Sequence, residues 1–372
     1  MADKTLHPYA PLDRTPPGDT LAESLNAIGM TQAELADRIG LARKTVNQII
    51  QGIAPITAET ALKLETVLGV PASFWINLDG TYQEFLARKA ELLEFQTEVA
   101  WLKRIPIAEM TARGWIAPCP DLATTLKAAL SFFGVASTEL WENRWAHFAV
   151  ACRRCHVTPT ELGVAACWLR KGEIDAQKIH TAPFHADQFR AALDSIRTLT
   201  LADPAVFQPR MTELCAAAGV ALVFTPELKK LLVSGATHWL TPEKALIQLS
   251  LRLKSDDHLW FTFFHEARHV LQSLKRGFFI EGLGTDGDLE DDANTFASNF
   301  LIPRARYDEF VRQADFTEPA VRNLATQAGI APGIVVGRLQ HDEVIALDRL
   351  NHLKRRFAWA SWSSATVSIP WG

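Results

Sequence analysis

The sequence lacks the features that would place it in or across a membrane. No apolar run approaches the roughly 18 residues that a membrane-spanning helix needs, and the opening MADKTLHPYA has no apolar core, so we expect neither a membrane span nor a signal peptide. Cysteine is scarce: five among 372 residues, an odd number, indicate free thiols in a reducing compartment. These absences predict a cytoplasmic protein without a membrane partner.

The sequence also lacks a strong excess of charge of either sign. A net charge of −4 argues against a basic nucleic-acid coat, but it leaves room for a DNA-binding face on one domain. At 372 residues the chain exceeds one ordinary domain and can bury two or more cores. We therefore expect a multi-domain protein.

A pentad in the C-terminal half, His265-Glu266-Ala267-Arg268-His269, has the spacing of a zinc site. On an α-helix, positions i and i+4 share a face, so the imidazoles of His265 and His269 can bind one Zn²⁺, with Glu266 beside it to deprotonate a water that the metal holds. The flanking residues are amphipathic at the helical period, and Asp256 or Asp257 is expected to be the N-cap. The alternative is an amphipathic helix with two ordinary histidines.

A second helical pattern, residues 289 to 303, supplies a third ligand. Three acids open this segment, and on a helical wheel Glu290 leans toward the apolar stripe, whereas Asp291 and Asp292 turn away from it. We therefore predict that Glu290 coordinates the metal. Asn294, one turn later, is placed to orient a ligand histidine or Glu290 itself. The plainer interpretation of the acidic run is favourable charge at a helix N-terminus.

Residues 211 to 345 resemble the ImmA/IrrE-type metallopeptidases, a family with a short zincin core. The resemblance rests on Ser234-Gly235-Ala236-Thr237, Gln248-Leu249-Ser250-Leu251-Arg252, Phe263-Phe264-His265-Glu266, Glu290-x-x-Ala293-Asn294-x-Phe296-Ala297 with Leu301-Ile302-Pro303, and Gly337-Arg338-Leu339-Gln340. It implies a zinc metallo-endopeptidase with ligands His265, His269 and Glu290 and with Glu266 as general base. The family usually has glycine in place of Arg268, a side chain that could stabilise an oxyanion, obstruct the cleft or point to solvent.

The N-terminal segment, residues 21 to 69, divides into four short helices. Thr31 and Glu34 form a capping box for the second helix, and Gly40 ends it. In the next helix, residues 42 to 51, apolar side chains face inward and donor-rich side chains face outward. Helix, short turn and polar-faced helix is the helix-turn-helix arrangement, in which the second helix enters the major groove of DNA. The alternative is a packing module with an incidental polar face.

This segment resembles the lambda-repressor-like (XRE) class and, within it, the HigA-type antitoxins. The matching residues run from Pro17-Gly18 through Gly29-Met30-Thr31-Gln32, Lys44-Thr45-Val46-Asn47, Ile56-Thr57 and Leu68-Gly69 to Phe74-Trp75. The resemblance implies that Gln32 contacts a phosphate of a double-stranded DNA operator and that the start of the recognition helix reads bases. The predicted DNA-binding residues are Gln32, Arg43, Lys44, Thr45, Asn47 and Gln48. Such repressors commonly bind two half-sites, so we expect a homodimer.

The motifs predict a mainly α protein with a small sheet (α+β). We expect a flexible arm (1–20), a four- to five-helix DNA-binding domain (21–80), a helical connector (81–210) and a zincin-like domain with a C-terminal tail (211–372). Short strands are expected at 220–224, 231–237 and 245–251, and alternation at 365–369 indicates a final strand. An edge strand beside the metal would be the platform for an extended peptide substrate.

The connector contains two further patterns. Its tryptophans are expected to be core or interface anchors rather than a cofactor box, with a sensor role left open: Trp101, Trp115, Trp141, Trp145 and Trp168. Cys152-Arg153-Arg154-Cys155-His156 has the spacing of covalent haem attachment, but such attachment is extracytoplasmic, and the sequence has no second C-x-x-C pair at finger spacing. We interpret these cysteines as ordinary thiols.

Two functions from different classes fit these motifs. In the first, a DNA-binding regulator or antitoxin-like protein carries a zinc endopeptidase that cleaves a repressor, a toxin or its own connector and so switches transcription. In the second, the zincin-like domain is a sensor or partner-binding platform of a repressor or antitoxin without proteolysis. Glu266 favours the first, because a structural zinc needs no base, whereas Arg268 speaks against it.

Overall fold

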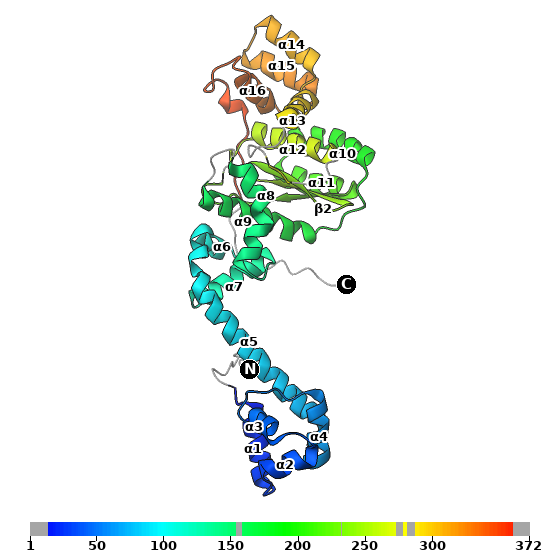
Figure 1. The fold of residues 1–372 in the computed structure, drawn as a ribbon. Helices are drawn as coiled ribbons and strands as arrows, with labels where there is room; N and C mark the ends of the chain where they lie inside the picture. Colours follow the sequence, from blue (N-terminus) through cyan, green and yellow to red (C-terminus); the bar gives the residue numbers. More distant parts are fainter. Residues whose placement is uncertain (1–13, 154–157, 232, 273–277, 281–286, 360–372) are drawn as a thin grey trace, which may run out of the picture. The chain divides into compact units, whose positions relative to one another are not determined.

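A computed structural model describes residues 14–153, 158–231, 233–272, 278–280 and 287–359 of the chain. The chain divides into two compact units (Figure 1). The first comprises Met1–Val99 and Asp121–Thr124, and the second Ala100–Pro120 and Thr125–Gly372. Among the described residues, every helix is too short or too polar to span a lipid bilayer.

The first unit is helical. It contains α1 (Pro17–Ala27), α2 (Gln32–Ile39), α3 (Arg43–Ile50), α4 (Ala58–Leu68) and α5 (Ala72–Glu98). The Thr31 side chain accepts a hydrogen bond from the backbone N–H of Glu34, and Gly40 ends α2 in the left-handed conformation, as predicted. The Glu34 carboxylate pairs with Arg38 on the next turn instead of closing the capping box.

The predicted boundaries of this unit do not coincide with the ends of its helices. α1 begins at Pro17, inside the segment predicted as an arm, because proline fits the first turn of a helix, where its missing N–H needs no partner. The earlier part of that arm, residues 1–13, lies outside the described residues. The boundary predicted at residue 80 falls inside α5, a continuous helix of 27 residues.

A close backbone approach holds the core of the first unit together. Large buried apolar side chains come from all five of its helices: Leu21, Leu35, Val46, Ile49, Leu64 and Trp75. Gly18 of α1 lies against the last turn of α3, where a Cβ on residue 18 would stand 2.2 Å from the carbonyl oxygen of Ile50. Only glycine lets α1 pack so closely on α3, which explains the Pro17-Gly18 pair at the start of α1.

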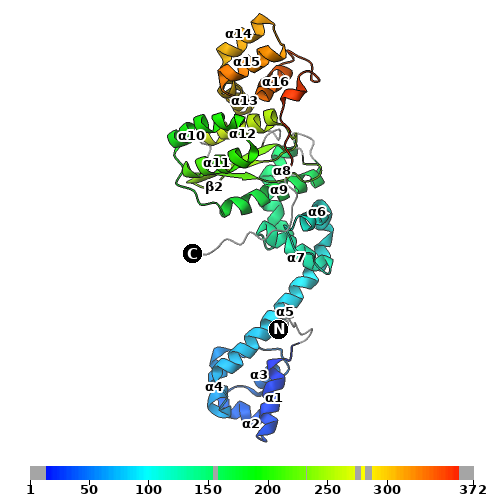
Figure 2. The same cartoon turned by 180° about the vertical axis from the view of Figure 1, so that it is seen from behind.

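The second unit is a sheet with helices on both faces (Figures 1 and 2). The elements before the sheet are η1 (Val99–Arg104), α6 (Ile107–Ala112), α7 (Leu122–Phe133), α8 (Thr138–Arg153), α9 (Pro159–Gln177), α10 (Ala186–Thr198), η2 (Leu199–Leu201) and α11 (Pro204–Ala217). The sheet and its following helices are β1 (Val220–Phe224), β2 (Gly235–Thr241), β3 (Lys244–Leu249), α12 (Asp256–Leu271), β4 (Phe278–Ile280), α13 (Gly287–Leu301), α14 (Arg304–Gln313), α15 (Glu318–Ala328), α16 (Pro332–His341) and η3 (Asn351–Leu353).

The four strands lie in the order β1-β3-β2-β4. β1 is parallel to β3, while β2 is antiparallel to both β3 and β4. β1 has the predicted bounds, but β2 begins at Gly235 rather than at residue 231, because its partner β3 already ends at Leu249, which pairs with Gly235. β4 was not predicted from the sequence. The strand predicted at 365–369 lies outside the described residues.

Both faces of the sheet are buried. One face packs on α12 through Val220, Leu222, Ala245, Ile247 and Leu249, and the other packs on α9 through Ala221, Val223 and Leu246. Gln248 donates a side-chain hydrogen bond to the carbonyl of Trp168 in α9 at 2.7 Å. In Figures 1 and 2, α9 accordingly lies on the opposite side of β2 from α11 and α12. The predicted connector thus contributes to the same core as the sheet, and the boundary predicted at residue 210 falls inside α11.

The tryptophans of the predicted connector pack in the interior. Exposure is at most 8% for Trp101, Trp141, Trp145 and Trp168, whereas Trp115 is half-buried. The rings of Trp101 and Trp141 meet edge to face, with centroids 5.2 Å apart. These contacts agree with the prediction of core anchors. The side chain of Cys152 and all of Cys155 lie outside what the structure describes.

Helix α12 begins with two buried acids. Its N-cap residue is Ser255, so the prediction of Asp256 or Asp257 at that position is wrong. Both carboxylates turn inward and meet the C-terminal segment: Lys354 Nζ lies 2.6 Å from Asp257 Oδ2, and the N–H of Arg355 donates to Asp256 Oδ1 at 3.1 Å. Burial raises the pKa of Asp256, and the charge of Asp257 adds to this effect. The start of α12 is therefore anchored inside the unit.

Candidate metal centre and DNA-binding surface

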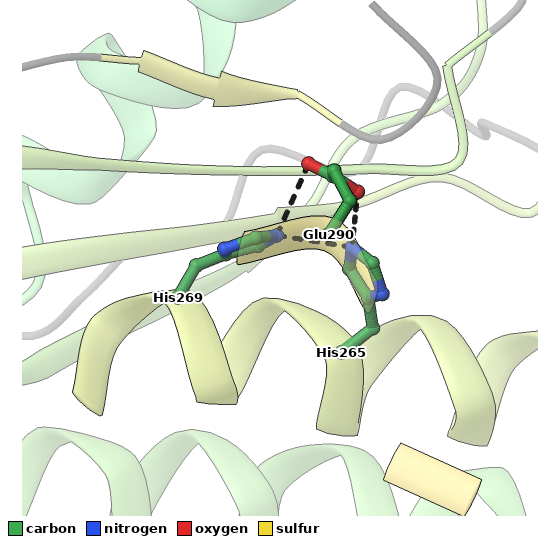
Figure 3. Close-up of side chains that lie close together, drawn as sticks. All are labelled: His265, His269 and Glu290. Carbon is green, nitrogen blue, oxygen red and sulfur yellow. Dashed lines mark hydrogen bonds and ion pairs between the residues drawn. The ribbon is translucent and has the colours of Figure 1, made fainter. Parts of the chain in front are cut away.

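Two helices bring three metal-ligating side chains together. His265 and His269 lie one turn apart on α12, and Glu290 reaches them from α13 (Figure 3). The two Nε2 atoms of His265 and His269 are 3.0 Å apart. The carboxylate oxygens of Glu290 lie 3.2 Å from His265 Nε2 and 3.4 Å from His269 Nε2. Both imidazoles are buried, so the three predicted ligands meet at one shielded point.

Two amide side chains fix the orientation of the imidazoles. Asn294 Oδ1 lies 3.0 Å from His265 Nδ1, and Gln272 Oε1 lies 2.9 Å from His269 Nδ1. The Gln272 amide has one possible orientation, because its NH₂ group donates to a backbone carbonyl of α13 and to the Asp292 carboxylate. An amide oxygen only accepts, so His269 carries its proton on Nδ1 and presents a lone pair at Nε2. In the orientation that the structure gives its amide, Asn294 accepts a hydrogen bond from His265 Nδ1 and so favours the same tautomer.

Gln272 is absent from the predicted site residues, whereas Asn294 lies against His265 as the sequence suggests. The sequence does contain a signal for Gln272. It follows His269 by three residues, and positions i and i+3 of a helix are neighbours on one face. A glutamine at that spacing is therefore a candidate outer partner of a ligand histidine.

The donor set fits a zinc ion. Two imidazole nitrogens and one carboxylate are ligands that zinc prefers, and three protein ligands leave the open position of a catalytic site. Around a tetrahedral ion with bonds of about 2.0–2.2 Å, neighbouring ligand atoms stand about 3.3–3.6 Å apart. The separations of 3.0, 3.2 and 3.4 Å are close to that spacing, at its short end. A cation would also offset the repulsion between two buried lone pairs that face each other.

Glu266 lies next to the first histidine, where α12 packs on β2. It is fully buried, and its backbone carbonyl accepts a hydrogen bond from Thr237 Oγ1 at 3.2 Å. Gly235 makes room for its side chain: a Cβ on residue 235 would stand 2.9 Å from Glu266 Oε1 and 2.8 Å from Glu266 Cγ. The backbone of β2 thus passes directly against the carboxylate, and only glycine permits that approach.

The Arg268 side chain is engaged outside the ligand cluster. Its Nε donates to Asp292 Oδ2 at 2.7 Å, and its guanidinium lies over the ring of Phe296, 5.4 Å from the centroid. Hydrogen bonds from Arg268 and Gln272 lower the pKa of Asp292. Arg268 therefore positions Asp292, which accepts a hydrogen bond from Gln272. This role differs from the three that the sequence suggested, which were to stabilise an oxyanion, to obstruct the cleft or to point to solvent. Asp291 is exposed on α13, as the wheel predicts.

The polar face of the N-terminal unit comprises the start of α2 and one side of α3. Val46 and Ile49 point inward from α3, with exposures of 1% and 2%. Of the predicted DNA-binding residues, Gln32, Arg43, Lys44 and Asn47 are exposed, while Thr45 and Gln48 are half-buried. All six thus lie on α2 or α3, the two helices that would meet DNA in a helix-turn-helix.

Comparison with known proteins identifies this N-terminal segment. Residues 21–75 match a family model described as helix-turn-helix. The HTH-type transcriptional regulator YddM of Escherichia coli is 33% identical over 73 residues, which cover 20% of this chain and 78% of that protein. Antitoxin HigA-1 of Vibrio cholerae is 32% identical over 92 residues, which cover 24% of this chain and 83% of that protein.

A solved structure gives a similar match. It is an addiction module antidote protein of the HigA family from Coxiella burnetii, with 33% identity over 23% of this chain and 92% of its own, and a TM-score of 0.21. The family model and the two relatives of 33% and 32% identity show that the chain belongs to the helix-turn-helix family of transcriptional regulators. Its N-terminal domain is of the XRE/HigA type, which is DNA-binding and antitoxin-like. This result confirms the class predicted for the N-terminal domain.

Proposed function

We propose that this DNA-binding regulator also carries a zinc-dependent endopeptidase, which cleaves a protein and thereby switches transcription. The strongest support is the convergence of His265, His269 and Glu290 at separations of 3.0, 3.2 and 3.4 Å, with Glu266 buried beside them. A structural zinc site closes its coordination with four protein ligands and needs no base. Three protein ligands and an adjacent carboxylate are instead typical of the zinc site of a hydrolase.

Each side chain has a defined task in this proposal. His265, His269 and Glu290 hold the ion, while Asn294 and Gln272 keep the imidazoles in the tautomer that binds it. When bound, zinc supplies Lewis acidity, which polarises a peptide carbonyl and makes water easier to deprotonate. The Glu266 carboxylate accepts the proton of the attacking water and passes it to the leaving amine.

The sheet suggests where the substrate backbone would lie. β2, whose Gly235 passes against Glu266, is paired with β3 on one side and with β4 on the other. Over the described part of the chain, the free edge on this side of the sheet is therefore that of β4. We assign β4 as the edge strand that pairs with an extended peptide, because backbone hydrogen bonds at a sheet edge bind peptides independently of their sequence.

The helix-turn-helix defines the other partners in the proposal. A regulator of this class binds a double-stranded operator, and pairs of half-sites call for a homodimer. The cleaved protein is then a partner repressor, a cognate toxin or the chain's own segment between its two functional ends. Cleavage of any of these would change operator occupancy and so couple proteolysis to transcription.

Elemental analysis combined with a search for new protein termini in cells tests the proposal. Wild type should hold one zinc ion per chain and produce termini that vanish in Glu266→Gln. That variant should retain zinc and operator binding, because neither the ligands nor α3 are altered. Glu213→Gln, at an exposed carboxylate with 67% side-chain exposure, is the matched control and should behave as wild type.

Three results would contradict parts of this proposal. A protein purified without zinc, and unable to take it up, would remove the metal centre. Termini that persist in Glu266→Gln would assign the base to another residue. Bound zinc without any new termini in wild-type cells would make the second unit a sensor or partner-binding platform of a repressor that acts without proteolysis.

A further inference from the structure

A cavity of about 310 Å³ opens beside the metal-ligand cluster. Two of its lining residues contact His265: Asn294 by a hydrogen bond, and Phe261 with its ring centroid 6.2 Å from that of the imidazole. Leu301 and Ile334, which are 3% and 4% exposed, give the cavity an apolar floor. This volume is at the lower end of ligand pockets, about 300–1,000 Å³. It suits a side chain of a bound peptide better than a large cofactor.

The lining of the cavity carries more positive than negative charge. Arg338 lines it and is paired with Asp342 at 2.6 Å. The acid of the lining, Asp257, is paired with Lys354 at 2.6 Å. Arg252 adds a further positive charge to these two neutralised pairs. The lining of the cavity therefore carries a net positive charge.

Arg252 is well placed to use that charge. Among the residues that the structure describes, no carboxylate forms an ion pair with it, and its hydrogen bond to Ser234 Oγ is long, at 3.5 Å. Ser234 directly precedes Gly235, the residue whose backbone passes against Glu266. Nearby, burial lowers the pKa of His258. The charge of Asp257 opposes this shift, whereas the charges of Lys354 and Arg252 add to it. The Arg252 guanidinium thus lies beside the start of β2, the strand that passes against Glu266.

We infer that this cavity binds an acidic side chain of the peptide substrate close to the cleaved bond, and that Arg252 is the specificity-determining residue. The inference rests on the proposed peptidase function. The methylene groups of a glutamate suit the apolar floor, and its carboxylate suits the planar guanidinium, which can bind both oxygens at once. A lysine or arginine in the same place would meet charge of its own sign, so the cavity also rejects basic side chains.

Peptide binding to zinc-loaded Glu266→Gln tests this recognition without turnover. The probe is a library of N-acetylated, C-amidated hexapeptides in which one position at a time is Glu, Gln, Lys or Leu. At one position, Glu should bind about twofold to fivefold more tightly than Gln, the range expected of an exposed charge pair. Adding Arg252→Gln should abolish this preference, and adding Arg252→Glu should reverse it toward Lys.

Arg210→Glu makes the same change of charge at an exposed arginine outside the cavity and should leave the preference intact. An acidic preference that is missing, or that survives in Arg252→Glu, would overturn the inference. Zinc content and cleavage by the wild type report on the proposed function separately. If the wild type cleaves peptides without an acidic preference, the peptidase stands and the role of Arg252 falls. If the preference is present but nothing is cleaved, Arg252 recognition stands and the peptidase falls.

Discussion

His269 donates a hydrogen bond from Nδ1 to Oε1 of Gln272 at 2.9 Å, and this bond determines which imidazole nitrogen faces Glu290. The Gln272 amide in turn donates to Asp292, which accepts a further hydrogen bond from Arg268. Arg268, the residue that departs from the metallopeptidase pattern, is thus connected through Asp292 and Gln272 to the candidate zinc ligand His269.

Replacing Gln272 should weaken zinc binding. Gln272→Ala removes the acceptor that fixes the His269 tautomer, and we expect zinc affinity to fall about 10- to 100-fold, as is usual for outer partners of ligands. Competition with a chromogenic chelator measures the change. Asp291→Asn is the control, because Asp291 is exposed on the neighbouring helix and has no contact with the cluster in the described structure. Unchanged affinity in Gln272→Ala would show that other contacts set the tautomer.

Adding one methyl group at residue 235 should destabilise the second unit. In Gly235→Ala the new Cβ would stand 2.5 Å from Thr262 Cγ2 and 2.9 Å from Glu266 Oε1, so the strand or the base must shift. We expect a loss of about 1–3 kcal/mol in the free energy of unfolding, measured by urea denaturation, and a loss of cleavage. Gly287→Ala meets nothing within 4 Å and should be close to neutral. Equal free energies of unfolding for Gly235→Ala and wild type would show that β2 can shift without a loss of stability.

The polar side of α3 should contribute directly to operator affinity. Lys44→Ala and Gln48→Ala should each weaken operator binding by about 1–3 kcal/mol if they read bases. Fluorescence anisotropy with a labelled operator at several salt concentrations measures the loss and separates phosphate contacts from base contacts. Lys63→Ala, on α4 and paired with Glu59 at 2.9 Å, serves as the control. Wild-type affinity in both α3 variants would move the reading surface elsewhere.

A buried ion cluster on the far face of the sheet should make stability depend on pH. Glu173 of α9 lies 2.6 Å from Arg170, 3.3 Å from Arg144 and 3.5 Å from His238 of β2. Burial alone would raise the pKa of Glu173, but hydrogen bonds from His238 and Arg170 and the charges of His238 and Arg144 lower it to about 2. A lowered pKa stabilises the fold above the unfolded value near 4.5 and loses that effect as pH falls toward 2.

Glu173→Gln isolates this contribution. At neutral pH the variant should be less stable than wild type by on the order of 3 kcal/mol. The difference should shrink as pH falls from about 4.5 toward 2, because the wild-type carboxylate then becomes neutral as well. Urea denaturation across this range measures it, with the exposed Glu213→Gln as control. A gap that stays constant with pH would mean that packing, not charge, explains the loss.

Local patterns predict the local parts of this protein well. The spacing of His265 and His269 along one helix places both imidazoles together, and the wheel position of Glu290 directs it toward them. The helix-turn-helix follows from Thr31, Gly40 and the apolar residues of α3, because caps and periodicity act within a few residues. These features depend on neighbours in the sequence.

The remainder depends on contacts between distant segments. From the sequence, Asp256 and Asp257 are candidates for the N-cap of α12. In the structure their carboxylates instead contact Lys354 and Arg355, about a hundred residues later in the chain. β4 is three residues long, too short to show a period. The role of Arg268 depends on Asp292 in another helix, and no pattern in the sequence announces that partner.

The placement of α9 has a practical consequence for dissecting this protein. A fragment that starts at residue 211 would retain every candidate zinc ligand but would expose Ala221, Val223 and Leu246 to water and leave the Gln248 amide without the Trp168 carbonyl. Such a piece should aggregate and lose its metal for reasons unrelated to catalysis. A minimal zinc-binding fragment must therefore begin upstream of Pro159, within the region that sequence alone assigns to a connector.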